Sequence, residues 1–203
     1  MQSTFPASAS SLLHALRAGT AKHHSDLERR LPFFSEAFDL TSFISLTQAY
    51  YGFYIGLEEA LQNSCQIPVN FDLPSRLKSP LLHQDLVALG VSKNSIYTLP
   101  FCECIPTINS QGAFLGVMYV LEGATLGGQI IARRISERFH LDPSTGTAFF
   151  NAYGADTGRR WQQFLYYLNH CSLPRDDFGL AVNAAKATFR SFEAWLETKE
   201  VLV

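Results

Sequence analysis

The chain has 203 residues, of which 47% are hydrophobic, so it can bury a sizeable core and is not a mainly disordered chain. With 16 lysine and arginine residues against 18 aspartate and glutamate residues, the formal net charge is −2, and no overall positive field exists to hold a nucleic acid. Four scattered cysteines are too few for a disulfide framework, which favours a reducing compartment.

The N-terminal residues are small and polar and do not have the pattern of a signal peptide. The longest apolar stretch, Ala113 to Leu121, is shorter than the roughly 20 residues that a membrane-spanning helix needs. We therefore expect a soluble, cytoplasmic protein that does not insert into membranes. Residues 1–9 are predicted to be a flexible tail, and residues 10–203 a single domain.

The first half of the chain carries three helical patterns. The first begins at Ser10 or Ser11, either of which can cap a helix, and ends before Pro32. The second covers residues 40–62 and is apolar almost all round, as expected for a helix in a packed core. After a proline-rich loop, a shorter pattern begins at residues 79–80 and ends at Gly90.

The second half continues the helical series. Residues 96–105 are the one plausible strand, and Pro100 and Pro106 argue against it. The longest helical pattern covers residues 110–140, and an aromatic helical pattern follows over residues 147–171 with interruptions around Gly154 and Gly158. A last helix is expected over about 176–197. Helices without a convincing strand predict a single all-α domain.

Histidine is the commonest metal ligand and a common axial ligand of haem iron, so the histidines are the first candidates for a site. His24 lies on an apolar helical face with Leu27, whereas His23 is rotated by about 100° toward the polar side. Glu28, four residues later, can orient the imidazole of His24. Arg17 lies two turns earlier, about 10 Å along the axis. The alternative interpretation is a core histidine that Glu28 satisfies.

A second candidate feature is the run LEGATLGGQ at residues 121–129. Glycine inside a helix costs roughly 1 kcal/mol relative to alanine, so three glycines within six positions require a compensating interaction. Gly123 and Gly127 lie one turn apart, and with Ala124 and Gly128 they form a strip without any side chain larger than a methyl. A flat ligand could press on this backbone and the helix could bend there, or another helix could pack closely against it.

Together, these two features resemble the haem oxygenase family. The segment LRAGTAKHHSDLE is similar to the proximal helix of haem oxygenases, and YVLEGATLGGQII is similar to their kinked, glycine-rich distal helix. The similarity continues through FFNAYG, RRWQQF and AAKATFRSFEAWL, so it spans nearly the whole chain. The resemblance implies an all-α, single-domain helical bundle with haem between a proximal helix and a kinked distal helix.

The resemblance also implies roles for the site residues. His24 corresponds to the proximal haem ligand, Glu28 to its orienting partner and Arg17 to a propionate contact, while the glycines of residues 121–129 form the distal backbone over the haem. Animal-type members have an aspartate where this chain has Ala124, although some bacterial members also have a small residue there. This departure bears on the route of proton delivery, to which Thr125 and ordered water are expected to contribute.

The C-terminal basic contacts of the haem propionates do not match this sequence cleanly. The corresponding segment reads WQQFLY at residues 161–166. Arg159 or Arg160 is a candidate substitute for the missing contact, and so is Tyr166 through its hydroxyl. The in-plane orientation of the haem is therefore left open by the sequence.

The implied reaction opens haem, as substrate and cofactor at once, to biliverdin, carbon monoxide and ferrous iron with consumption of O2. No G-x-G-x-x-G fingerprint follows a strand, so we expect electrons from a separate reductase or ferredoxin. A bacteriophytochrome that accepts biliverdin is one candidate partner, and iron acquisition is the other candidate purpose. Two alternatives stay open: a non-catalytic haem-binding or haem-sensing protein on the same fold, and a helical protein that never binds haem.

Overall fold

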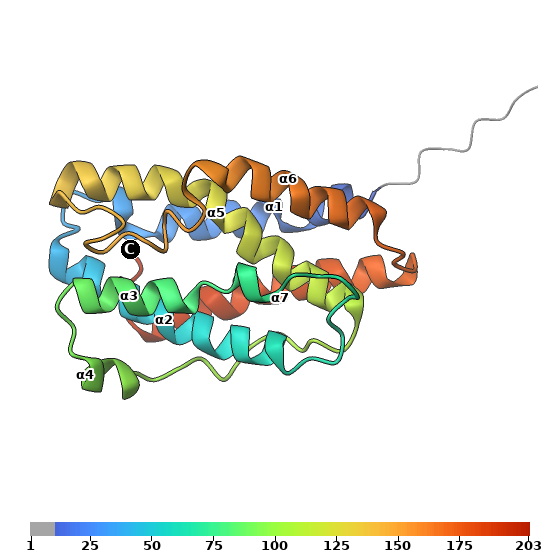
Figure 1. Cartoon of the computed structure of the whole chain (residues 1–203), viewed down its shortest axis with the longest axis horizontal. Coiled ribbons are helices and arrows are strands. Elements are labelled where there is room, and N and C mark those ends of the chain that lie inside the picture. Colours follow the sequence, from blue (N-terminus) through green and yellow to red (C-terminus); the bar gives the residue numbers. More distant parts are fainter. Residues whose placement is uncertain (1–10) are drawn as a thin grey trace, which may run out of the picture.

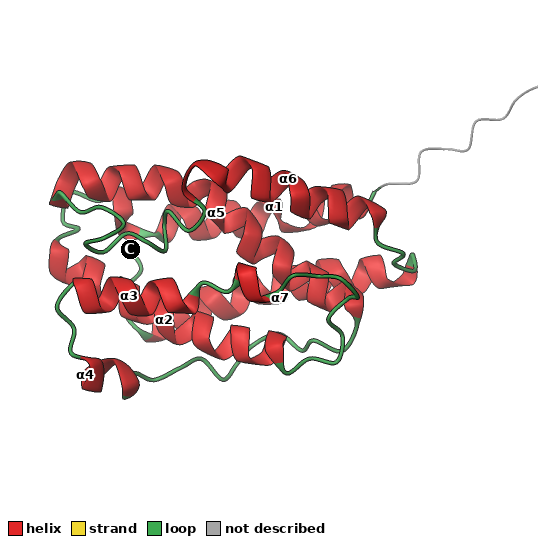
Figure 2. Cartoon of the chain, viewed as in Figure 1, coloured by secondary structure: helices red, strands yellow, loops and turns green. Residues whose placement is uncertain are grey.

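Helices make up the architecture of residues 11–203, the part of the chain that the computed structural model describes (Figures 1 and 2). The long helices are α1 (Leu12–Arg30), α2 (Leu40–Gln62), α5 (Gln111–Phe139), α6 (Thr157–His170) and α7 (Asp176–Thr198). Two shorter helices are α3 (Ser79–Ala88) and α4 (Lys93–Tyr97). Single 3-10 turns cover Pro32–Phe34, Pro74–Arg76 and Gly154–Asp156. The predicted all-α domain is confirmed, and the predicted tail over residues 1–9 lies outside the described residues.

Serine side chains fix the starts of α1 and α5. The Ser11 hydroxyl accepts a hydrogen bond from the backbone N–H of His14 at 3.2 Å, and the Ser110 hydroxyl accepts one from that of Ala113 at 3.0 Å. Each bond satisfies a backbone donor that the first turn of a helix leaves unpaired. α5 ends at Phe139, and its C-cap residue His140 adopts the left-handed conformation with φ of 56°. The ends of these helices therefore follow from local sequence.

Helix α7 supports both α1 and α5. A Cβ atom added at Gly116 of α5 would overlap the carbonyl oxygen of Ala181, and one added at Gly112 would lie 2.5 Å from another α7 carbonyl oxygen. α1 approaches α7 at Gly19, where an added Cβ would lie 2.5 Å from Val182 Cγ1. Glycine permits each of these approaches because it has no side chain. Packing on α7 therefore determines the positions of both α1 and α5.

Half of the most apolar 18-residue window of α5 is buried in the core. Within residues 11–203, α5 is the one helix long and apolar enough to cross a membrane by length and composition. Its side chains Phe114, Val117 and Met118 are fully buried, and its C-terminal half runs in a different direction from its N-terminal half (Figure 1). The place of α5 at the centre of the bundle accounts for its apolar sequence.

Residues 96–105 do not form the strand that the sequence left possible. α4 ends at Tyr97, and the following segment lies across α2, where the N–H of Cys102 donates to the carbonyl oxygen of Gly52 at 2.9 Å. A Cβ at Gly52 would lie 2.5 Å from the carbonyl oxygen of Pro100. The segment therefore packs on a helix face and pairs with no other extended segment among the described residues.

The helix predicted from residue 147 begins instead at Thr157. Turns occupy the preceding residues, and their first part is held by Asp85 of α3, whose carboxylate accepts the N–H groups of Ala148 at 2.7 Å and Phe149 at 2.8 Å. Phe149 and Phe150 of this segment are buried without a helix to space them. Helical spacing of aromatics was therefore a misleading signal over these residues.

Candidate functional site

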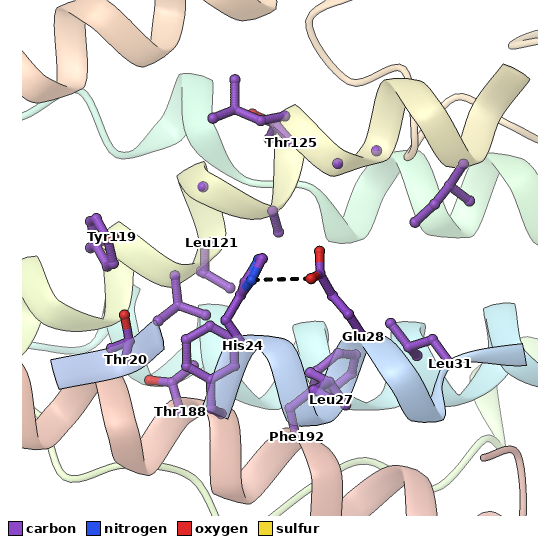
Figure 3. A pocket seen from close by; sticks show the side chains of 18 of the residues that line it. Thr20, His24, Leu27, Glu28, Leu31, Tyr119, Leu121, Thr125, Thr188 and Phe192 are labelled. Atoms are coloured by element: carbon purple, nitrogen blue, oxygen red, sulfur yellow. Dashed lines mark ion pairs between the residues drawn. The ribbon is translucent and has the colours of Figure 1, made fainter. Parts of the chain in front are cut away.

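A cavity of about 410 Å³ lies between α1 and α5 and is lined in addition by α2 and α7 (Figure 3). This volume falls within the range of ligand pockets, roughly 300 to 1,000 Å³. Several residues that the sequence analysis selected line it: Arg17, His24, Glu28, Gly123, Ala124, Thr125, Gly127 and Gly128. The structure thus brings the two features found in the sequence to opposite walls of one cavity.

His24 projects from α1 toward α5, and its side chain is 55% exposed (Figure 3). Its Nδ1 lies 3.4 Å from Oε2 of Glu28, and its ring meets that of Phe189 edge to face, with centroids 5.9 Å apart. Nε2 has no hydrogen-bond partner among the described residues. A half-exposed ring that lines a cavity does not fit the interpretation as a core histidine. It leaves one imidazole nitrogen free to coordinate a metal.

The glycines of the distal helix differ in what lies opposite them. A Cβ added at Gly127 would meet no atom within 4 Å, and one at Gly123 would meet only the Trp161 ring, at 3.9 Å. At Gly128, by contrast, an added Cβ would lie 2.7 Å from the carbonyl oxygen of Phe150. Gly128 therefore allows close packing, Gly123 lies at contact distance from the Trp161 ring, and Gly127 leaves bare backbone beside open space.

Thr125 lines the cavity with its hydroxyl hydrogen already engaged. The hydroxyl donates to the carbonyl oxygen of Glu122 at 2.7 Å, one turn earlier in α5. Bonds of this kind often bend a helix, and this one lies within the glycine-rich stretch. Thr125 can still accept a hydrogen bond, but it has no second hydrogen to give.

The structure does not bring Arg159 or Tyr166 to the cavity. The Arg159 guanidinium pairs with the carboxylate of Asp156 at 2.7 Å, and Tyr166 is 66% exposed with its ring stacked on His170 at a centroid distance of 3.9 Å. Both side chains belong to the outer face of α6. Arg160 also has its guanidinium engaged elsewhere, as a donor to Ser75.

Sequence reasoning missed the aromatic wall of the cavity. α2, α7 and the turn before α6 contribute Tyr50, Phe53, Tyr54, Phe149, Phe150, Phe189 and Phe192. Apolar residues almost all round the second helical pattern marked it as a core helix, and the same property could have indicated that one face borders a ligand pocket. A largely apolar wall with few polar groups suits a large, flat, apolar ligand.

A buried polar cluster lies behind the distal wall. Glu122 of α5 is 1% exposed, and its carboxylate pairs with the guanidinium of Arg76, with Nζ of Lys78 at 2.8 Å and with the hydroxyl of Tyr153 at 2.8 Å. Burial lowers the pKa of Lys78, and the Glu122 carboxylate opposes that change. Lys78 also lines the cavity.

The residues that line the cavity are chemically suited to bind haem. A single imidazole is the protein ligand of haem iron in globins and peroxidases, and His24 offers one on the α1 wall. The bare backbone at Gly127 leaves room for a flat ring on the α5 wall, and Arg17 supplies a positive charge at the lining. These residues fit the group that the sequence resemblance implies.

Comparison with known proteins gives the same assignment. A family model described as "Heme oxygenase" matches residues 10–198. A heme oxygenase of Xanthomonas campestris pv. campestris (strain 8004) is 28% identical over 162 residues, which cover 78% of this chain and 90% of that protein.

Solved structures agree in fold. The heme oxygenase from Leptospira interrogans has a TM-score of 0.75 at 17% identity and covers 93% of this chain and 100% of its own. Heme oxygenase-1 from the cyanobacterium Synechocystis sp. PCC6803, solved in complex with heme, has a TM-score of 0.74 at 20% identity, with 93% and 92% covered.

Proposed function

Because this chain belongs to the haem oxygenase family, we propose that it opens haem oxidatively to biliverdin, carbon monoxide and ferrous iron. The observation that carries the proposal is the cavity itself, with the free imidazole nitrogen of His24 on one wall and the bare backbone of Gly127 on the other. Haem is the substrate and supplies the oxygen chemistry when bound. The residues of this chain bind the ring, orient it and control water and protons.

On the α1 wall, His24 would hold the haem iron through Nε2. Glu28, 3.4 Å from Nδ1, holds the ring orientation and favours a proton on Nδ1, which leaves Nε2 unprotonated for the metal. Arg17, two turns before His24, is the proposed propionate partner because a guanidinium binds carboxylates with two parallel hydrogen bonds. With Arg159 and Tyr166 away from the cavity, the second propionate contact has to come from elsewhere.

On the α5 wall, the positions without a large side chain leave backbone at the cavity surface. Gly123, Ala124 and Gly127 carry nothing larger than a methyl and would leave room for the ring, and the aromatic residues of α2 and α7 would shield it from bulk water. Ala124 cannot donate a proton, so the proposed reaction depends on ordered water and on other polar groups of the cavity.

The proposed partners follow from what the chain must receive and release. Electrons come from a separate reductase or ferredoxin, and O2 enters as co-substrate. Biliverdin passes to an acceptor such as a bacteriophytochrome, or iron is the required product. The cytoplasmic location stays a prediction from the sequence.

Reconstitution with hemin tests the proposal. Hemin is added to the purified chain, followed by ascorbate or a reductase with its electron donor under air. We expect a Soret band of a histidine-ligated complex, then its loss as biliverdin absorbance rises, with the isomer identified by chromatography. A spectrum that stays that of free hemin in buffer would contradict any role of the cavity in haem chemistry.

One observation favours a second candidate function. Ala124 replaces the aspartate that orders distal water in animal-type relatives, which is compatible with a protein that binds or senses haem without degrading it. In that case the hemin complex forms normally and stays intact with ascorbate or a reductase. Product analysis of the same reconstitution distinguishes the two functions.

A further inference from the structure

Two of the aromatic side chains that line the cavity come from a turn and not from a helix. Phe149 and Phe150 lie in the segment between α5 and α6, line the cavity and are 8% and 5% exposed. The Phe149 ring meets that of Tyr54 in α2 edge to face, with centroids 4.9 Å apart, and the Phe150 ring meets that of Phe33 in the same way at 5.4 Å. Because no helix carries these two rings, their place depends on what holds the turn.

Asp85 of α3 holds that turn from outside the cavity. It is 1% exposed and does not line the cavity. Its Oδ1 accepts the backbone N–H of Ala148 at 2.7 Å, and its Oδ2 accepts that of Phe149 at 2.8 Å. Two bonds from one carboxylate to consecutive N–H groups fix both the position and the orientation of the backbone there. Burial raises the pKa of Asp85 and these two N–H groups lower it, so they are the partners that compensate for the buried charge.

The opposite side of the turn lies against the distal helix. A Cβ atom added at Gly128 of α5 would lie 2.7 Å from the carbonyl oxygen of Phe150. Gly128 directly follows Gly127, the position whose bare backbone borders the cavity. The turn is thus held between Asp85 on one side and α5 on the other.

We propose that Asp85 is a positioning residue of the haem site. Its carboxylate fixes the turn, and the turn in its place sets the Phe149 and Phe150 rings at the cavity wall and the approach of α5 at Gly128. The inference rests on the proposed function, and it assigns a role in haem binding to a residue outside the cavity lining. Displacement of either ring would change the space that holds the macrocycle, so the effect of Asp85 reaches haem affinity.

Asp85→Asn is the substitution that tests this role. The amide has nearly the size of the carboxylate but only one acceptor oxygen, so its NH2 group opposes the second backbone N–H. We expect the Kd for hemin to rise about 10-fold, because a hydrogen bond to a charged group is worth at least that much. The Soret circular dichroism of the bound complex should change too, since it reports the aromatic rings around the haem. A wild-type Kd or a wild-type Soret signal in Asp85→Asn would overturn the inference.

Asp142→Asn is the matched control. The Asp142 carboxylate also accepts two backbone N–H groups of the segment between α5 and α6, from Ser144 at 2.7 Å and from Thr145 at 3.1 Å. These three residues are exposed, and none of them lines the cavity. We expect Asp142→Asn to bind hemin with the wild-type Kd. Equal losses of affinity in the two variants would overturn the specific role of Asp85.

A double-mutant cycle tests the connection between Asp85 and α5. Gly128→Ala adds a methyl group 2.7 Å from the Phe150 carbonyl oxygen, so the turn or the helix must move. In the wild-type background we expect this overpacking to raise the Kd for hemin about 10-fold. In the Asp85→Asn background the loosened turn can yield, so the same substitution should raise the Kd by less than about 3-fold. Additive effects on affinity would overturn the inference.

Amide hydrogen exchange of the unsubstituted chain decides the question if the Asp85 variant does not fold. Hemin should slow exchange at the N–H groups of Ala148 and Phe149 by about 10-fold or more and leave exchange at Ser144 and Thr145 unchanged. Unchanged exchange at Ala148 and Phe149 would overturn the inference. Reconstituted wild type that binds hemin but forms no biliverdin would overturn the proposed function instead, and the hemin affinities would still measure the role of Asp85.

Discussion

His23 and His24 are neighbours in the chain but lie in different surroundings. His24 faces the cavity with a free Nε2, whereas Nδ1 of His23 is buried without a hydrogen-bond partner among the described residues. One helical step of 100° separates them. Glu28 and the apolar face of the helix both led the sequence analysis to select His24, which is the histidine that faces the cavity.

Replacing His24 tests its role as axial ligand. We expect His24→Ala to lose the histidine-ligated haem spectrum and all biliverdin formation, since no other histidine lines the described cavity. His23→Ala is the matched control and keeps both. Absorption and electron paramagnetic resonance spectra of the two hemin complexes make the comparison. An unchanged spectrum in His24→Ala would reject the assignment.

The glycines of α5 could be assigned to different roles only from the structure. Gly112 and Gly116 have the same one-turn spacing as Gly123 and Gly127, so periodicity cannot distinguish them. The first pair lies against the backbone of α7, and Gly127 lies beside open space. What lies opposite a residue depends on tertiary packing, which sequence spacing alone does not contain.

A pair of substitutions should therefore give opposite results. Gly127→Val should leave the unfolding free energy near wild type and weaken hemin binding by about 10-fold or more, because overpacking costs roughly 1 to 3 kcal/mol when the site cannot relax. Gly116→Ala should lower the unfolding free energy by a similar amount because its Cβ overlaps the Ala181 carbonyl oxygen. Denaturant titration and hemin titration of both variants check this. If Gly127→Val binds hemin as tightly as the wild type, the small residues at positions 123–128 serve helix packing and not haem binding.

At the scale of elements, sequence periodicity predicted the long helices well and the segment before α6 poorly. The caps at Ser11 and Ser110 are local interactions, so they are visible in the sequence. The turns that precede Thr157 depend on Asp85, a residue more than 60 positions earlier. The cavity wall formed by α2 was missed for another reason. A core helix and a helix that borders a cavity have the same composition.

Asp85 makes the stability of this segment depend on pH. Burial raises the pKa of Asp85 from 3.8 to about 6, against the opposing effect of the two backbone N–H groups that its carboxylate accepts. The folded state therefore holds this proton more tightly than the unfolded state. Its contribution to the unfolding free energy is fully present below pH 3.8 and is lost as the pH rises through about 6.

Comparison with Asp85→Asn isolates that contribution. The variant does not titrate, and the other carboxylates cancel in the difference. We expect the unfolding free energy of the wild type to fall relative to that of the variant by about 2 kcal/mol between pH 4 and pH 7. Urea denaturation at several pH values measures it. Parallel pH profiles would contradict the prediction.

At the scale of the whole molecule, the cavity separates the proximal and distal helices, so a bound ligand joins two parts of the bundle. Ligand that binds only the folded state stabilises it by about 2.7 kcal/mol at 100 times its Kd. We expect hemin at that excess to raise Tm by roughly 5 to 10 °C. The same concentration should raise Tm much less in His24→Ala. Calorimetry with and without hemin checks both. A wild-type Tm that hemin leaves unchanged would contradict binding between the two walls.

The seating of α1 and α5 on one helix has a consequence for variation in this protein. The gap between the two walls depends on two positions outside the cavity lining, Gly19 and Gly116, where each helix approaches α7. A bulkier residue at Val182 would tilt or lift α1 without altering any side chain that lines the site. Two chains with identical cavity residues can therefore differ in the distance between α1 and α5. The packing of each helix on α7 determines that distance.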